Sequence, residues 1–175
     1  MKSLGNYRAL LAKVDEMTAG ISTAHAAHIT CHRGCDSCCR HLSLSLVEGV
    51  ALAEALSSLP EDKACFLREK AKAATADGPC PLLDNGECAL YVHRPIICRT
   101  HGLPILVSEG DGQRIDFCPL NFRNVQTLPG DAVVALERLN TILAAVNKFF
   151  VTEYHAAGTS GKDRLSIAEA LLLEV

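Results

Sequence analysis

Nine cysteines fall within one stretch of this 175-residue chain, between Cys31 and Cys118, and no other feature limits its fold as strongly. The N-terminus carries charges throughout and lacks the continuous apolar segment of a signal peptide. We therefore expect a cytoplasmic protein, in which thiols stay reduced. Disulfide frameworks belong mostly to small secreted chains with an even number of cysteines. The sequence thus favours metal or iron–sulfur ligation by these thiols.

Composition and charge restrict the partners. Apolar residues make up 49% of the chain and charged residues 21%, which is a globular balance, and the length fits a single domain over residues 1–175. The net charge of −3 and the lack of a dense Lys/Arg block argue against nucleic-acid binding. No run of about 18 apolar residues would span a bilayer. Neither nucleic acid nor a membrane is expected as a partner.

Apolar spacing predicts helices on both sides of the cysteines, and hence a mainly α fold. Residues 4–21 carry an apolar residue at every third or fourth position: Leu4, Tyr7, Leu11, Val14, Met17 and Ile21. Ser45-Leu-Val-Glu48 has the form of a capping box and predicts a helix through Leu56. Pro60 predicts the start of another helix, which ends before Asp77.

The region over 131–175 is expected to form C-terminal helices. Asp131 is the expected N-cap of a long amphipathic helix that reaches about Tyr154. A Gly/Ser linker at 158–161 separates it from a short last helix, which a second capping box at Ser166 begins.

The middle of the chain is expected to be rich in loops. Pro and Gly recur between residues 79 and 130, so short elements should alternate with turns. Asp84-Asn-Gly86 predicts a tight hairpin, and residues 94–102 predict a short helix. Residues 103–107 and 114–117 predict a second hairpin. Because aromatic residues make up only 5% of the chain, metal ligation would supply stability that this middle otherwise lacks.

The first cysteine group is a C-x3-C-x2-C-C array of Cys31, Cys35, Cys38 and Cys39. In a straight helix Cys31 and Cys39 would lie about 12 Å apart along the axis. Four sulfurs on one zinc must lie within roughly 4 Å of each other. The segment therefore either wraps as a loop, which Gly34 permits, or divides its thiols between sites. Side chains of neighbouring residues diverge, so Cys38 and Cys39 are expected to serve different roles or different metals.

The second cysteine group is dispersed over Cys80, Cys88, Cys98 and Cys118. Four thiolates complete a zinc site or an iron–sulfur cluster, so the eight allow two full sites, or one site with spare thiols. Zinc ribbons usually pair two C-x2-C knuckles, and only one is present, from Cys35 to Cys38. A cysteine followed by proline recurs in cluster ligation, and both Cys80 and Cys118 have that form. These features favour an iron–sulfur cluster, [4Fe-4S] above other types, with Zn²⁺ as the alternative.

The combined motifs resemble the cysteine-cluster family of zinc- or iron-chelating proteins (YkgJ type). The resemblance covers residues 31–120 and rests on the array at Cys31–Cys39, Cys80-Pro, Gly86-x-Cys88-x2-Tyr91, Arg94-Pro-x2-Cys98-Arg99 and Cys118-Pro. It implies metal or iron–sulfur binding by the eight motif cysteines: Cys31, Cys35, Cys38, Cys39, Cys80, Cys88, Cys98 and Cys118. No catalytic residue is assigned.

The remaining residues near the motif have supporting roles in this reading. Cys65 lies outside the pattern and is expected to be a small, buried apolar residue of a helix. Arg94 and Arg99 are expected to compensate the negative charge of the thiolates without binding the metal themselves. The histidines near the cysteines are more often hydrogen-bond partners of the ligands than ligands.

The expected function is therefore cysteine-ligated metal binding, with an electron-transfer, redox-sensing or maturation role and a redox or protein partner. Two alternatives stay open: a zinc-stabilised interaction module, and a metal-dependent enzyme that modifies proteins.

Overall fold

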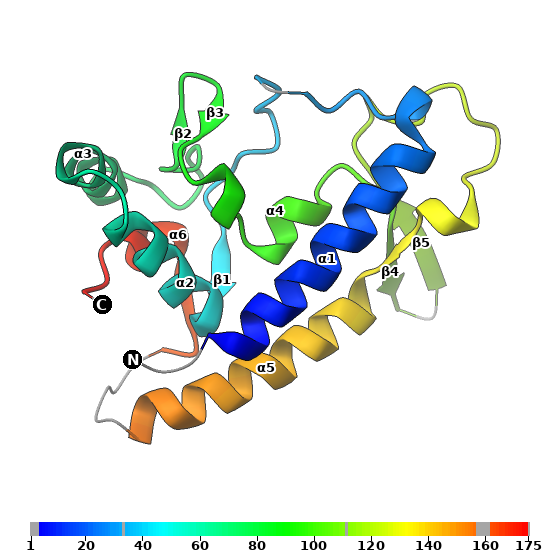
Figure 1. The fold of residues 1–175 in the computed structure, drawn as a ribbon. Coiled ribbons are helices and arrows are strands. Elements are labelled where there is room, and N and C mark those ends of the chain that lie inside the picture. Colours follow the sequence, from blue (N-terminus) through cyan, green and yellow to red (C-terminus); the bar gives the residue numbers. More distant parts are fainter. Residues whose placement is uncertain (1–3, 33, 111, 157–161, 175) are drawn as a thin grey trace.

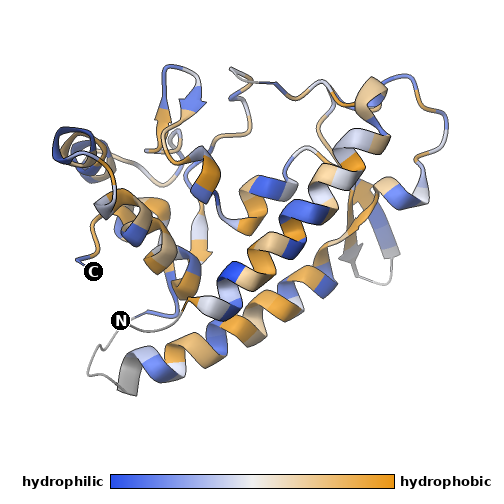
Figure 2. Ribbon diagram, viewed as in Figure 1, coloured by the Kyte–Doolittle hydropathy of each residue, from blue (hydrophilic) through white to orange (hydrophobic). Residues whose placement is uncertain are grey.

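Two long helices form one side of the molecule. The computed structural model describes residues 4–32, 34–110, 112–156 and 162–174. Helices α1 (Gly5–Ala24) and α5 (Leu136–Ala156) lie side by side and run in opposite directions (Figure 1). Apolar and polar residues alternate along both, as expected of helices that bury one face (Figure 2). Their apolar faces form much of one core cluster, with buried residues Tyr7, Val14, Ile21, Leu139 and Phe150.

Three shorter helices pack around a second core cluster. They are α2 (Leu46–Ser57), α3 (Glu61–Lys72) and α6 (Ile167–Leu171). Both predicted capping boxes are present, at Ser45–Glu48 before α2 and at Ser166–Glu169 before α6. The buried residues of this cluster include Leu52, Leu56, Leu67, Ile167 and Leu171, and the half-buried Cys80 and Cys88 pack against it. The cysteine-rich segment therefore rests partly on this helical core.

Short strand pairs join segments that are distant in sequence. Strand β1 (Ser43–Ser45) pairs antiparallel with β7 (Arg164–Ser166), so the residues just after the first cysteine group are joined to the C-terminal region. Strands β2 (Leu83–Asp84) and β3 (Glu87–Cys88) form the predicted tight hairpin. Its turn residues Asn85 and Gly86 have φ of 47° and 78°, as a two-residue hairpin turn requires.

The second predicted hairpin carries an unpredicted third strand. Strands β4 (Ile105–Glu109) and β5 (Gly112–Asp116) pair antiparallel, and β6 (Val134–Ala135) adds to β4 in parallel. The prediction that Asp131 caps the long helix is therefore wrong, because α5 begins only at Leu136. Residues 130–132 form a short 3-10 helix instead, and the backbone N–H of Val134 donates to the Pro104 carbonyl oxygen at 2.7 Å.

The expected fold class is confirmed: the chain is mainly helical with short hairpins. Helix α4 (Ile96–Thr100) confirms the predicted short helix of the middle region. The predicted linker at 158–161 lies outside the described residues. None of the described helices has the length and apolarity needed to cross a bilayer.

A buried carboxylate connects α2 to the start of α4, and its removal is expected to destabilise the protein. Glu48 is 4% exposed and accepts hydrogen bonds from the backbone N–H and hydroxyl of Ser45 and from the backbone N–H of Ile96, at 3.1, 2.8 and 3.1 Å. Glu48→Ala should lower the free energy of unfolding, measured with urea, by about 3 kcal/mol. The substitution removes a helix cap and leaves the buried N–H of Ile96 without its partner.

Glu169 provides the matched control, since it occupies the same position of the other capping box but is exposed. Glu169→Ala should cost about 1 kcal/mol. Equal losses in the two variants would contradict the role given to the bond between Glu48 and Ile96.

Candidate metal centre

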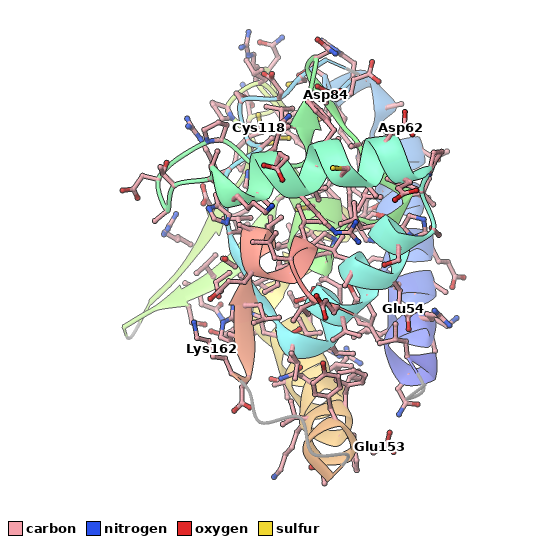
Figure 3. The ribbon with its side chains drawn as sticks, turned by 90° about the vertical axis from the view of Figure 1, so that its left-hand side faces the viewer. Glu54, Asp62, Asp84, Cys118, Glu153 and Lys162 are labelled. Atoms are coloured by element: carbon pink, nitrogen blue, oxygen red, sulfur yellow. The ribbon has the colours of Figure 1, made fainter. Side chains whose placement is uncertain are left out.

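All eight motif cysteines line a single cavity of about 820 Å³. Cys118 lies at the same end of the molecule as Asp84 of the tight hairpin, and Glu153 and Lys162 lie toward the opposite end (Figure 3). Cys65 is not among the lining residues, but is exposed on α3 rather than packed as a core residue. The cysteine-bearing segments are thus gathered in space, although they span Cys31 to Cys118 in sequence.

Backbone hydrogen bonds bring the end of the first cysteine group to the hairpin. The N–H of Cys80 donates to the carbonyl oxygen of Cys39 at 3.1 Å, and Arg40 forms an isolated antiparallel bridge with Pro79. The N–H of Leu83 donates to the Cys80 carbonyl oxygen at 2.9 Å. Because Leu83 also pairs with Cys88 across the hairpin, these contacts connect the backbones of Cys39, Cys80 and Cys88.

Helix α4 brings Cys98 to the same region. Pro95 occupies its N-cap position, and the bond from Ile96 to Glu48 fixes its first turn. Burial raises the pKa of Cys98 to about 12, with smaller contributions from Cys80, Cys88 and Cys39. Cys98 is therefore a half-buried thiol that is protonated at neutral pH in the metal-free protein.

The other end of the cavity is built around Gly102 and Asn121. Gly102 has φ of +91°, and a Cβ at this position would stand 3.2 Å from the Cys31 sulfur and 3.6 Å from Cβ of Cys118. The amide nitrogen of Asn121 donates to the Gly102 carbonyl oxygen at 2.7 Å and to the sulfur of Cys31 at 3.4 Å. Its amide oxygen accepts from the backbone N–H of Thr30 at 2.9 Å. This buried side chain therefore fixes the loop of Cys31 against the segment of Cys118.

The first cysteine group is a series of turns rather than a helix. The N–H of Cys35 donates to the His32 carbonyl oxygen at 3.1 Å, and the N–H of Cys39 donates to that of Asp36 at 2.8 Å. Gly34 has φ of +86°, a conformation that glycine adopts without strain. The segment is therefore a loop and not the straight helix that would separate Cys31 from Cys39.

Burial keeps several thiols neutral. It is the main cause of the raised pKa of Cys38 and Cys80, each to about 11, and it also raises the pKa of Cys39 and Cys88. Arg94 opposes this effect, because its positive charge lowers the pKa of Cys39, Cys88 and Cys98. A bound cation would favour the thiolate forms in the same direction.

The two arginines of the motif differ in position. Arg94 lines the cavity, and its guanidinium lies over the ring of the exposed Tyr91, 3.6 Å from the ring centroid. Arg99 does not line the cavity but pairs with Asp15 of α1 and donates to the backbone carbonyl oxygens of Arg94 and Val92, each at 2.7 Å. Arg94 is therefore the arginine that faces the thiols, whereas Arg99 holds the preceding loop against α1.

Histidines near the cysteines also divide by position. His32 and His101 line the cavity. His41 does not, because both ring nitrogens contact the backbone: Nδ1 lies 2.8 Å from the Thr75 carbonyl oxygen, and Nε2 lies 3.1 Å from the amide nitrogen of Ala168. His41 therefore fixes the cysteine loop to the helical core.

The extent of the cysteine cluster agrees with a known family. Residues 30–119, about half of the chain, match the family CxxCxxCC, described as "Putative zinc- or iron-chelating domain". The chain belongs to this family. Its CxxCxxCC domain holds all eight cysteines of the cavity, and here three residues, not two, separate Cys31 from Cys35. No curated protein and no solved structure matches the chain significantly.

The donors around the cavity of the CxxCxxCC domain fit the metals that the family name gives. Thiolates are soft ligands suited to zinc and to iron–sulfur clusters, and eight surround one space. In the described parts of the chain, no three Cys, His, Asp or Glu side chains already form a group that could hold one metal ion. The thiols therefore surround a space rather than a preformed single-ion site.

Asn121 is the residue beside the cysteine cluster that the sequence did not indicate, and its truncation is expected to destabilise the protein. It lies just outside the matched residues and is 1% exposed. Asn121→Ala leaves the Gly102 carbonyl oxygen and the Thr30 N–H without this partner. The expected cost is about 2–4 kcal/mol in urea unfolding, since each unpaired buried group costs about 1–3 kcal/mol.

Asn124 is the matched control because it is an exposed asparagine of the same loop. Asn124→Ala should change the unfolding free energy by less than about 0.5 kcal/mol. A neutral Asn121→Ala variant would contradict the proposed role of this amide.

Proposed function

We propose that the cysteines of the cavity bind iron–sulfur, with [4Fe-4S] the favoured type and four of the eight thiols ligating each cluster. The observation that carries this proposal is the set of eight thiols around one space of about 820 Å³. A single tetrahedral zinc draws four sulfurs to within roughly 4 Å of each other and needs no such space. The cavity therefore favours a larger inorganic group.

When bound, the cluster supplies one-electron chemistry. The chain's own residues hold and shield it. Cys98, Cys80 and Cys88 are at least half-buried, which limits access of water to their sulfurs. The positive charge of Arg94 acts on the thiols of Cys39, Cys88 and Cys98, and positive charge near a cluster favours its reduced form. These properties suit electron transfer, redox sensing or a maturation step in the reducing cytoplasm, with a redox or protein partner.

A zinc-stabilised interaction module is the second candidate. It is favoured by an exposed apolar surface next to the cavity, where Tyr91, Val92 and Ile97 are 60%, 76% and 42% exposed. A surface of this kind suits contact with another protein. In this case the metal would fix the loops that present the surface and would have no redox role.

Anaerobic purification separates the two candidates. An iron–sulfur protein should be brown, absorb broadly in the visible range and contain iron together with acid-labile sulfide. Reduction with dithionite should bleach the absorption. A colourless protein with stoichiometric zinc and no sulfide would overturn the iron–sulfur proposal and support the interaction module.

A further inference from the structure

Helix α5 carries a second apolar stripe, which the fold leaves uncovered. Its core-facing side contributes the buried Leu139 and Phe150 to the core cluster that it shares with α1. On another side of the helix, Ile142 and Phe149 are 42% and 68% exposed, and the small, exposed Ala145 lies between them. Steps of three and four residues place these three side chains on one face. Because the solvent side of a surface helix is normally polar, the stripe indicates a contact surface.

Opposite charges stand at the two ends of this stripe. Arg138 lies four residues before Ile142, and Glu153 lies four residues after Phe149, so both side chains share its face. Both are exposed, and within the parts of the chain that the structure describes neither forms an ion pair. Lys148 directly precedes Phe149 and therefore points about 100° away around the helix axis. The stripe thus has one basic end and one acidic end.

The apolar part of the stripe is complementary to itself when two copies of α5 run antiparallel. With a two-fold axis between Ala145 and Val146, each residue faces the one that lies equally far on the other side of the axis. Ile142 lies three residues before Ala145, and Phe149 lies three residues after Val146. Ile142 of one copy therefore meets Phe149 of the second copy, and this contact occurs twice. The small Ala145 near the axis lets the helices approach closely.

The charges obey the same symmetry. Arg138 lies seven residues before Ala145, and Glu153 lies seven residues after Val146. The same axis therefore brings Arg138 of each copy opposite Glu153 of the other, which forms two ion pairs at the ends of the apolar contact. A parallel pair would instead set Arg138 against Arg138 and Glu153 against Glu153, and like charges repel. The charges thus select the antiparallel arrangement.

We infer that the chain forms a two-fold symmetric dimer through α5, so that a second copy of this chain covers the stripe. None of the stripe residues lines the cysteine cavity, and Glu153 lies toward the end of the molecule opposite Cys118 (Figure 3). The dimer therefore uses a surface separate from the cavity and does not depend on the proposed metal binding. Because each copy contributes few large side chains, the dimer should dissociate on dilution.

Sedimentation equilibrium of the full-length chain, purified anaerobically and kept with a reductant, tests the dimer. The wild type should show a reversible equilibrium between monomer and dimer. Phe149→Asp should stay monomeric where the wild type dimerises, because it places a carboxylate in the apolar centre of the contact. Phe66→Asp is the matched control and should dimerise like the wild type, since Phe66 is 49% exposed on α3 and not on α5.

Exchange of the charges tests the antiparallel direction. Arg138→Glu should weaken dimerisation about tenfold, because two like-charge pairs replace two ion pairs. Combining Arg138→Glu with Glu153→Arg should restore the wild-type dissociation constant, since opposite charges then face each other again. Lys148→Glu is the matched control, and it should leave the constant unchanged because Lys148 points away from the stripe.

A wild-type chain that stays monomeric at every concentration would overturn the dimer and point to a different protein as the occupant of the stripe. A Phe149→Asp variant that dimerises as well as the wild type would also overturn it. A double charge exchange that fails to restore dimerisation would overturn the antiparallel pairing. Circular dichroism checks the helix content of each variant, and Ile142→Asp serves if Phe149→Asp does not fold.

Discussion

Removal of the metal is expected to cause the largest loss of stability that this protein can show. Ligand binding to the folded state alone stabilises it by about 4 kcal/mol when the free metal is at a thousand times its dissociation constant. Cys80 and Cys88, both half-buried, pack against one apolar cluster, whereas Cys31 and Cys38 are exposed. We therefore expect chelation to lower the unfolding free energy by at least that amount.

Hydrogen exchange locates this effect. Chelation should raise amide exchange in β2, β3, α4 and residues 34–39, because the metal holds these segments together. Helices α1 and α5 should stay protected, since their contact rests on the apolar core. Cys65→Ser should respond like the wild type. An unchanged melting temperature after complete chelation would contradict the stabilising role of the metal.

Acidification is expected to release the metal steeply. Cys38, Cys80 and Cys98 have pKa values of about 11, 11 and 12 in the metal-free fold, so each is protonated at neutral pH. Each thiol must lose its proton to bind metal. Lowering the pH by one unit therefore weakens apparent affinity about tenfold per thiol ligand, and about 10⁴-fold for a four-thiol centre.

The stability of the metal-free protein should instead fall at alkaline pH. The raised pKa of these thiols means that the unfolded chain deprotonates first as the pH rises above about 9. The folded state then loses stability between pH 9 and about 12, and loses none from these groups below that range. The predicted pH dependence of metal binding is measured by competition with a chromophoric chelator at several pH values. An apparent metal affinity that stays constant between pH 6 and 8 would contradict thiol ligation.

Local signals in the sequence predicted the helical framework well. The capping boxes at Ser45–Glu48 and Ser166–Glu169 operate within four residues, so their hydrogen bonds can be inferred without knowledge of the fold. The Asn85-Gly86 turn is equally local. The apolar spacing of residues 4–21 gave the buried face of α1, although Met17 is 36% exposed.

Features that depend on distant pairing could not be predicted. Strand β6 forms because the Val134 N–H donates to the Pro104 carbonyl oxygen and residues 134–135 pair with β4. Because of this pairing, α5 begins at Leu136 and not after Asp131. Asn121 showed no signal in the sequence, because its partners Thr30 and Gly102 lie 91 and 19 residues away.

The candidate site was predictable in composition but not in arrangement. The eight cysteines could be chosen by motif, yet the separate positions of Arg94 and Arg99 follow from the packing of α4 against α1. The assignment of residues 1–175 to one domain stays a prediction.

X-ray absorption at the metal edge of the anaerobic protein tests the central claim most directly. If the gathered cysteines bind the metal, the first shell should consist of sulfur at about 2.3 Å, whether the metal is iron or zinc. For an iron–sulfur cluster, a second shell of iron should follow. A first shell made mainly of oxygen or nitrogen would contradict the account.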